Sequence, residues 1–449
     1  MSNDIIENIN FDFLLGIIKI ENVEYLGVVK ESELIGIYEG NDIYKIIKVD
    51  FLPFGNVEMD DTPFYLEHFI HSNDFYISKN KFCDDEFVWN MHMQNNFFNA
   101  KHKSDSNLKI KHCPDLNRQN YLIGHMICGY FVNKTFKIDQ DFYNMKLLSL
   151  VSSNKMGTRL LSRGIDIDGN VSFFVKTTFE CKKNIKVLLS LTVIRGSVPL
   201  FWKQKNKGIN GKLYFTGNRK DLETSFDKHF NKLEKTFGKV HVITLLGEKK
   251  DEKILNDAYI DLLSNKNIKH TVFDLNSHTH EFDNLKNLFF WHLNKIDTED
   301  LVYRVNCIDC LDRTNLAQFL ICKFRLDKIL KDPKVDLILQ ECWTENGNSL
   351  SNLYTGSDVM KKEFMERFNK KGKVYSFGRV SKINDKEYVV EYKNSNFVIK
   401  TQEKYKIGDW VVFYGVFNNG VVQAEYVENI SGVDVNILER FVNFLEDNA

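Results

Sequence analysis

Between residues 146 and 371 the sequence alternates strand-length apolar runs with longer stretches of helical spacing, and this alternation constrains the fold most. Runs such as VSFFVKTTFE, KVLLSLTVI and KVHVITLL interleave with stretches such as DLETSFDKHFNKLEKTFG and DEKILNDAYIDLLSNK. Strands that alternate with helices usually form a largely parallel sheet that the helices cover. The pattern therefore predicts an α/β domain over residues 146–371.

The two flanking segments have a different character. Residues 1–145 contain short β-rich runs, with a helix expected around DDEFVWNMHM and a loop or linker over residues 100–120. Residues 372–449 contain five strand-like runs separated by turn signals, and then a helical stretch that starts at Asp434. We therefore expect a multidomain chain of the α+β or α/β class. It comprises a β-rich domain over 1–145, the α/β domain, and an OB-type barrel with a terminal helix over 372–449.

Composition excludes several broad classes of protein. The 60 Lys+Arg and 61 Asp+Glu residues give a formal net charge of -1, which excludes a globally basic nucleic-acid binder and an acidic disordered chain. The eight cysteines are scattered and no basic leader precedes them, so we expect reduced thiols in the cytosol. No uncharged apolar run reaches about 18 residues, so we expect no transmembrane helix and only peripheral membrane contact.

The densest chemistry lies in the segment LVYRVNCIDCLDRTNLAQFLICKF, which begins at Leu301. We expect LVYRV to be a buried strand and the part after the loop to be a helix, with Cys307 and Arg313 at their junction. A tight loop at a helix N-terminus presents backbone N–H groups to phosphate oxygens, and an arginine can bind two of those oxygens at once. The same positive helix end favours a nucleophilic thiolate at Cys307.

Two carboxylates, Asp309 and Asp312, lie inside this loop. A carboxylate beside a phosphate is kept protonated by like-charge repulsion, so Asp309 is our first candidate for the general acid. The other carboxylate would face Arg313 or Arg304 as a structural ion pair. Thr314 either hydrogen-bonds the thiolate or serves as a helix-start hydroxyl.

The full string RVNCIDCLDRTN resembles, in nearly every letter, the signature of the Sac-domain (suppressor-of-actin) phosphoinositide phosphatases. Other stretches resemble that family in the same order: GIIKIENVEYLGVV, IYKIIKVDFLPF, FYIS, FVWNMHM, GTRLLSRGIDIDGNVSFFV, IRGSVPLFWKQ, FDKHF and WTENGNSLSNLYTGS. The resemblance covers residues 11–370. Arg159 and Arg163 lie within these motifs and are expected to support the site, without an assigned contact to substrate.

The resemblance implies a β-rich N-terminal subdomain and an α/β catalytic subdomain. It also implies hydrolysis of phosphate monoesters on the inositol ring of membrane lipids, without a metal or other cofactor, through a phosphocysteine. Phosphatidylinositol 4-phosphate and other monophosphates are the implied substrates. The implied setting is membrane trafficking, with a cytoplasmic protein bound peripherally to endomembranes.

Four residues are candidates for binding the substrate: Asn306, Arg195, Lys203 and Lys205. Asn306, like Asn315, is expected chiefly to brace the loop, and Arg195 lies in one of the motifs above. Lys203 and Lys205 follow a Phe-Trp pair in a basic stretch. That stretch is either a rim for anionic lipid head groups or a solvated loop.

The sequence departs from the family's pattern at four positions. Phe173 and Lys176 stand where that pattern has Asn and Glu, and Asn348 and Leu353 stand where it has Asp and Gln. The catalytic loop is intact, so we expect activity, while substrate preference and efficiency stay open. The alternative is a catalytically weak Sac-like scaffold that binds phosphoinositide.

The same loop permits two other interpretations. Cys307 and Cys310 form a CxxC pair, which suits zinc or redox chemistry only with further ligands or a different context. No second ligand pair stands out among the residues weighed for it, which are Cys322, Cys342, His278 and His280. No metal site is therefore expected. Cys310 either protects Cys307 from irreversible oxidation by forming a disulfide or merely packs beneath the loop.

The segment 372–449 weakly resembles the small subunit of replication protein A, which is mainly an assembly piece. From residue 373 onward it has nine Lys+Arg and eleven Asp+Glu, a net charge of -2. A groove for single-stranded nucleic acid needs a positive track, so nucleic acid is not the expected ligand. We expect this module to dock a protein partner or the preceding Sac-like part of the chain; the alternative is that its terminal helix only caps the barrel.

Overall fold

The computed structural model describes the chain in the segments 10–20, 23–53, 62–104, 122–159, 161–204, 212–248, 250–275, 282–298, 300–355, 372–384, 387–392, 395–418 and 421–429. Two compact units divide the chain: residues 1–133 with 150–153, and residues 134–149 with 154–449. Among the described helices, none is long and apolar enough to cross a membrane. Several predictions from the sequence concern residues outside these segments: Lys205, the two histidines of the NSHTHEF stretch, and the terminal helix from Asp434.

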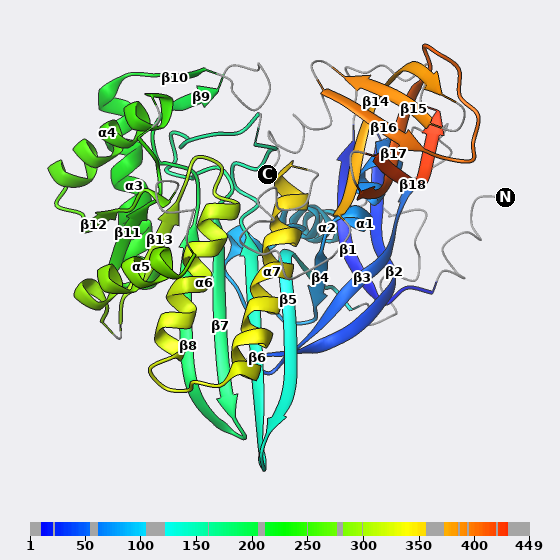
Figure 1. Ribbon diagram of the computed structural model, residues 1–449. Coiled ribbons are helices and arrows are strands. Elements are labelled where there is room, and N and C mark those ends of the chain that lie inside the picture. The colour runs from blue at the N-terminus through cyan, green and yellow to red at the C-terminus, as the bar shows by residue number, and fades with distance from the viewer. Residues whose placement is uncertain are drawn as a thin grey trace. The chain divides into compact units, whose positions relative to one another are not determined.

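The first unit is built on antiparallel strands that neighbour one another in chain order (Figure 1). They are β1 (Phe13–Ile20), β2 (Val23–Tyr38), β3 (Asn41–Pro53), β4 (Phe75–Ser78) and β5 (His125–Ile138). Helix α1 (Thr62–Ser72) packs on β3, and α2 (Met91–Ser104) packs on β1. The second contact needs a glycine in β1, because a Cβ at Gly16 would lie 2.3 Å from the carbonyl oxygen of Met93.

The helix expected around DDEFVWNMHM is divided in the structure. A 3-10 turn covers Asp85–Phe87, and α2 begins only at Met91. The intervening residues are engaged by the sheet: backbone Trp89 N donates to Met126 O at 2.7 Å, and side-chain Asn90 Nδ2 donates to Leu15 O at 2.9 Å. Tertiary hydrogen bonds therefore override the helical pattern. Conversely, α2 extends into the first residues of the expected loop over 100–120.

In the second unit, parallel strands form the part of the sheet that carries the site. The strand order is β6 (Asp141–Val151), β7 (Val175–Lys183), β8 (Lys186–Arg195), β13 (Val302–Asn306), β11 (Val240–Thr244) and β12 (His270–Val272). The pairs β8–β13, β13–β11 and β11–β12 are parallel, as the alternation of strands and helices predicts. A separate two-stranded ribbon joins β9 (Trp202–Gln204) to β10 (Leu213–Phe215).

The helices of this unit are α3 (Arg219–Phe237), α4 (Lys250–Asn265), α5 (Phe282–Ile296), α6 (Asp312–Leu326) and α7 (Pro333–Thr355). Three of them, α3, α4 and α6, follow stretches that the sequence predicts to be helical, whereas α5 and α7 were not predicted. Helix α3 begins where the Asn218 side chain accepts a hydrogen bond from Asp221 N, and it ends at Gly238 with a positive φ of 74°. Helices α6 and α7 lie side by side, and α6 packs on β8 and β13 (Figure 1).

The strand predicted to begin at VSFF starts later than expected. β7 begins at Val175, because Phe173 adopts a left-handed backbone with φ of 53°. Its ring stacks on Tyr354 with the ring centroids 4.2 Å apart. One of the four departures from the family pattern therefore lies at a strained turn in the core.

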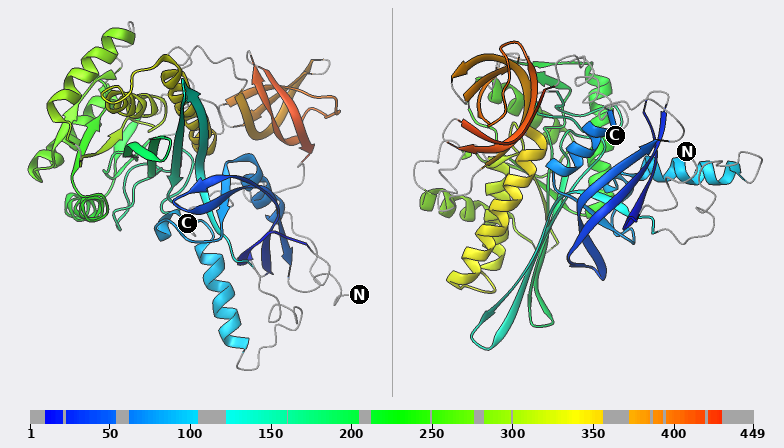
Figure 2. Two further views of the ribbon diagram at one scale, coloured as in Figure 1. Left: turned by 90° about the horizontal axis from the view of Figure 1, so that it is seen from below. Right: turned by 90° about the vertical axis from the view of Figure 1, so that its right-hand side faces the viewer.

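Residues 372–429 form a closed five-stranded barrel (Figure 2). Its strands are β14 (Gly372–Asn384), β15 (Glu387–Tyr392), β16 (Ser395–Lys400), β17 (Trp410–Asn418) and β18 (Val421–Asn429). Each predicted strand-like run forms one of these strands. Alternate positions fill the interior, where Val390, Ile399, Val411 and Phe413 are completely buried.

Candidate active site

Cys307 lies in a short loop between strand β13 and helix α6, as the sequence predicts. β13 is an inner strand between β8 and β11, so the loop lies at the carboxyl edge of parallel strands, where α/β proteins form ligand sites. The turn is tight. Cys310 has a positive φ of 56° and its Sγ donates to Cys307 O at 3.6 Å, and both cysteines are buried.

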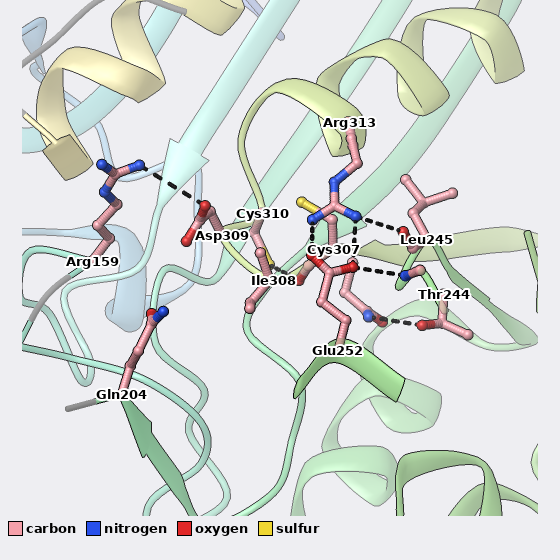
Figure 3. A network of polar contacts seen from close by, with 12 residues as sticks. Arg159, Gln204, Thr244, Leu245, Glu252, Cys307, Ile308, Asp309, Cys310 and Arg313 are labelled. Atoms are coloured by element: carbon pink, nitrogen blue, oxygen red, sulfur yellow. Dashed lines mark hydrogen bonds and ion pairs between the residues drawn. The ribbon is translucent and has the colours of Figure 1, made fainter. Parts of the chain in front are cut away.

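Arg313 is held in a fork by Glu252, a residue that the sequence analysis missed (Figure 3). Arg313 Nη1 donates to Glu252 Oε2 at 2.9 Å and to Leu245 O at 3.1 Å, and Nη2 donates to Glu252 Oε1 at 2.8 Å. Burial alone would lower the pKa of Arg313, but the charges of Cys307 and Glu252 outweigh it, so the pKa is raised. The arginine is therefore a fixed cation.

The contacts of Arg313 leave one edge of its guanidinium available. Of its five N–H donors, Glu252 and Leu245 engage three. The remaining two are the Nε–H and the second hydrogen of Nη2, which lie along one edge. Within the described residues neither has a protein partner. That edge has the geometry to bind two oxygens of a phosphate while Glu252 holds the other edge.

Asp309, the first candidate for the general acid, forms an ion pair with two arginines that the sequence did not single out as its partners. It lies 2.5 Å from Arg163 Nη2 and 3.9 Å from Arg159 Nη1. Arg163 also donates to Ile308 O at 2.9 Å and to Gln204 Oε1 at 3.0 Å, and it packs over the Trp202 ring. Strand β9 and the arginine pair thus fix the tip of the loop.

The expected ion pair between a loop carboxylate and Arg313 or Arg304 does not occur. Arg313 binds Glu252 instead, and Arg304 contacts no carboxylate in the part of the chain that the structure describes. Asp312 starts helix α6 and lies in the electrostatic field of Arg195. Asp309 and Arg313 find their charged partners in other elements: Arg163 lies in the loop before β7, and Glu252 lies on α4. The spacing of these residues along the sequence does not indicate that they meet.

The remaining candidates lie behind or beside the loop. Asn306 braces it: Nδ2 donates to Thr244 Oγ1 at 3.3 Å and Oδ1 accepts from Arg304. Thr314 is fully buried, and its Oγ1 has no hydrogen-bond partner within the described residues, so neither reading of this hydroxyl is realised here. Arg195 is buried against α6, and Lys203 is exposed on β9.

The structure bears on the alternative roles of the cysteines. Burial and the charge of Cys307 raise the pKa of Cys310 to about 12, which opposes the thiolate that a disulfide-forming partner needs. Its protective role stays a prediction. The described residues contain no group of three or more His, Cys, Asp or Glu that could hold a metal ion.

Glu252 and Gln204 were not found from the sequence, because their positions become informative only once the order of the strands in the sheet is known. Glu252 lies in the first turn of α4, the helix that follows β11, and β11 pairs in parallel with β13. Residues after neighbouring parallel strands meet at one edge of a sheet. With the strand order known, an acidic residue after β11 would be a natural partner for Arg313; without it, nothing singles out Glu252.

Comparison with known proteins bears on the part of the chain that precedes the Cys307 loop. Residues 65–283 match the family model Syja_N, described as the SacI homology domain. This part of the chain is therefore similar to the SacI homology domain, in agreement with the resemblance, and the match ends before Cys307.

Similar proteins include inositol-1,4,5-trisphosphate 5-phosphatase 1 of Schizosaccharomyces pombe, 32% identical over 284 residues, or 58% of this chain and 26% of that protein. Phosphatidylinositide phosphatase SAC2 of Danio rerio is 30% identical over 49% of this chain and 22% of its own length. Phosphatidylinositol-3-phosphatase SAC1-B of Danio rerio is 26% identical over 63% of this chain and 51% of its own length. The chain thus spans about a quarter of the first two relatives and about half of the third.

Among solved structures, telomere capping protein Ten1 of S. pombe matches 18% of this chain and 88% of its own length. It does so with 11% sequence identity and a TM-score of 0.16. A likeness at this TM-score carries no argument about fold or function.

Proposed function

We propose that this chain is a phosphoinositide phosphatase that removes phosphate monoesters from the inositol ring through a phosphocysteine intermediate. The observation that carries the proposal is the placement of Cys307 at the carboxyl edge of the sheet, with Arg313 held beside it on the first turn of α6. The printed names of its relatives, which are phosphatases of inositol phosphates and phosphoinositides, support the class of substrate.

In the first step the Cys307 thiolate attacks phosphorus, an S–P bond forms, and the bond from phosphorus to the inositol oxygen breaks. The free edge of Arg313 binds two of the phosphoryl oxygens and stabilises the charge that develops on them. Glu252 contributes by fixing the plane of the guanidinium rather than by touching the substrate.

The leaving inositol oxygen takes its proton from Asp309, with Asp312 as the alternative acid. Arg163 and Arg159 hold the Asp309 carboxylate at the tip of the loop. In the second step water attacks the phosphocysteine, its proton passes to the same carboxylate, and inorganic phosphate leaves with the thiolate restored.

Within this substrate class, we propose phosphatidylinositol 4-phosphate and other monophosphates as the substrates. We also propose that the protein is cytoplasmic, binds endomembranes peripherally and acts in membrane trafficking. The relatives' printed names specify the 5-position in one case and the 3-position in another. A panel of lipids is therefore needed to decide the ring position. Lys203, exposed on β9, and Lys205 are our candidates for contacts with the lipid head group.

The barrel of residues 372–429 is assigned to the OB type, and with the segment to residue 449 it would dock a protein partner. The closed five-stranded topology and the net charge of -2 support this assignment over nucleic-acid binding.

The test is release of phosphate from short-chain phosphoinositides that differ in ring position, with wild type and Cys307→Ser compared in the presence and absence of EDTA. We expect turnover by the wild type with at least one monophosphate, no turnover by Cys307→Ser, and no effect of EDTA. Binding of phosphoinositide without any turnover by the wild type would favour the scaffold alternative instead.

A further inference from the structure

Two arginines lie completely buried behind the catalytic loop, at the same edge of the sheet. Arg195 ends strand β8, and Arg304 lies in β13, three residues before Cys307. In the parallel register Val305 pairs with Arg195, and Arg304 pairs with Ile194. Paired residues share a face and successive residues alternate, so the two guanidinium groups lie on opposite faces of the sheet.

Arg195 is bound only by neutral acceptors. It donates to Asn315 Oδ1 at 2.9 Å, to Gln318 Oε1 at 2.5 Å and to Cys310 O at 3.4 Å. Its Nε is buried without a partner in the described residues. Burial lowers the pKa of Arg195 to about 10, and the charges of Cys310, Cys307 and Asp312 oppose that shift. At neutral pH this side chain is therefore a buried cation.

Arg304 has neutral partners on the other face. It donates to Ser197 O at 2.8 Å, to His229 Nε2 at 3.2 Å and to Tyr259 OH at 3.3 Å. Burial and the charge of Arg304 lower the pKa of His229 well below its ordinary value, and burial raises the pKa of Tyr259 to about 12. Both side chains are thus uncharged at neutral pH.

The charges around the loop do not balance. Arg313 and Arg163 each have a carboxylate partner, whereas Arg195 and Arg304 have no ion pair within the described residues. Burying a charge without a counter-charge is costly, so an anion is expected nearby. The titratable groups around Cys307, grouped by element, are Arg195 on β8, Arg304 on β13, Tyr259 and Glu252 on α4, His229 on α3, Asp309 and Cys310 in the loop, Asp312 and Arg313 on α6, and Arg163 in the loop before β7.

We propose that Arg195 and Arg304 form a buried pair of cations behind the loop. This arginine pair holds Cys307 as a thiolate and attracts a phosphate dianion. The proposal rests on the proposed function in taking Cys307 as the nucleophile. Neither arginine reaches the substrate, so both are positioning residues that act through the loop. Hydrogen bonds to neutral acceptors hold the two guanidinium groups in place, so these groups need not move when the anion binds.

The test measures ionisation of the Cys307 thiol independently of turnover. Iodoacetamide alkylation of Cys307 is followed by peptide mass between pH 5 and 9 in the full-length protein. Gln318→Glu is the decisive variant, because it places a carboxylate on Arg195 with almost no change of shape. We expect the pH of half-maximal alkylation to rise by about one unit, so that alkylation at a pH well below both midpoints becomes about tenfold slower.

Further variants separate charge from structure. Arg304→Gln and Arg195→Gln should also raise the pH of half-maximal alkylation. Arg304→Lys and Arg195→Lys keep the positive charge and should bring that pH most of the way back to the wild-type value. Gln340→Glu adds the same charge on α7 and should leave the midpoint unchanged. If the arginine variants do not fold, Gln318→Glu decides alone.

A folded Gln318→Glu protein whose alkylation midpoint equals that of the wild type overturns the proposed role of the arginine pair. That result is distinguishable from failure of the proposed function. If the wild type is active and the midpoint does not shift in Gln318→Glu, the phosphatase activity stands and the role of the arginine pair is rejected. If the wild type is inactive and the midpoint shifts in Gln318→Glu, the role of the arginine pair stands and the phosphatase activity is rejected.

Discussion

Arg313 is gripped along one edge of its guanidinium by Glu252, and two donors remain for a ligand on the other edge. A planar cation that is already oriented loses little conformational entropy when it binds phosphate. Without its partner, the same side chain would adopt several rotamers. At the scale of single residues, the orientation of Arg313 is thus the feature on which phosphate binding depends most.

We therefore predict that Glu252→Gln lowers kcat by about 10- to 100-fold, because the arginine loses its fixed plane. Arg313→Lys should lower kcat further, since an ammonium group lacks the fork. The measurement is steady-state release of phosphate from a short-chain lipid. Glu248→Gln is the matched control, because Glu248 is exposed nearby and pairs with Lys253. Activity in Glu252→Gln equal to that of the control would exclude a positioning role.

Cys307 and Arg313 could be predicted from the sequence because their six-residue spacing is local and the flanking strand and helix are strongly patterned. Glu252 could not, since it lies 61 residues before Arg313 and meets it only through the parallel pairing of β11 with β13. The ion pair of Asp309 could not be predicted for the same reason. Arg163 lies 146 residues from Asp309, and a long-range contact of this kind leaves no periodicity in the sequence.

At the scale of single elements, the turn before β7 combines two opposing effects at Phe173. Its left-handed backbone costs roughly 1–2 kcal/mol for a non-glycine residue, whereas its buried ring stacks on Tyr354. The sequence predicted a strand through this position from its apolar letters. Backbone sign is not visible in such a pattern, so the later start of β7 could not be predicted.

Asn tolerates the left-handed region better than Phe, but removing a buried aromatic ring costs about 3–5 kcal/mol. We therefore predict that Phe173→Asn lowers the free energy of unfolding by about 1–3 kcal/mol, measured by urea denaturation. Phe173→Leu, which keeps apolar volume and the same strain, should lose less. An Asn variant as stable as the wild type would show that backbone strain, not packing, dominates at this turn.

Helix α3 is joined to β13 through a neutral histidine. His229 Nδ1 donates to Gly169 O at 3.0 Å, and Nε2 accepts from Arg304. Burial, reinforced by the charge of Arg304, lowers the pKa of His229 well below 6.5, and burial lowers the pKa of His241 to about 4. A proton on Nε2 would face the Nε–H of Arg304, so the native state resists it.

The sign of the pH effect follows from these depressed pKa values. Below pH 6.5 the unfolded chain binds protons at these histidines while the native chain does not. The free energy of unfolding therefore decreases as the pH decreases. The fall continues to about pH 4 for His241. We predict a loss of about 1 kcal/mol per pH unit from each histidine below pH 6.5 in urea titrations. His229→Gln should show a shallower slope, and an unchanged slope would contradict the assignment.

At the scale of the whole molecule, the chain combines a segment similar to the SacI homology domain with a closed five-stranded barrel. The barrel's five strands were predictable because each run is bounded by turn residues, whereas its closure depends on the parallel pairing of β16 with β18, which no local pattern specifies. The barrel has its own buried core, which includes Val390 and Phe413.

We predict that deleting residues 372–449 changes phosphate release from a short-chain lipid by less than about twofold, because the barrel has a core cluster of its own and supplies none of the residues around Cys307. The same deletion should remove binding to a protein partner. Phe413→Asp, which places a charge in the barrel core, should reproduce both results in the full-length chain. Salt-sensitive binding of single-stranded DNA that is lost in this variant would favour the nucleic-acid interpretation instead.

The phosphocysteine intermediate is the central claim, and rapid-quench mass spectrometry tests it most directly. Wild type is mixed with short-chain phosphatidylinositol 4-phosphate, quenched within one turnover, and digested. We predict the mass of one phosphoryl group on the peptide that contains Cys307, its disappearance as inorganic phosphate forms, and no such adduct in Cys307→Ser. Phosphate release by Cys307→Ser at the wild-type rate, with no adduct in either protein, would contradict the account.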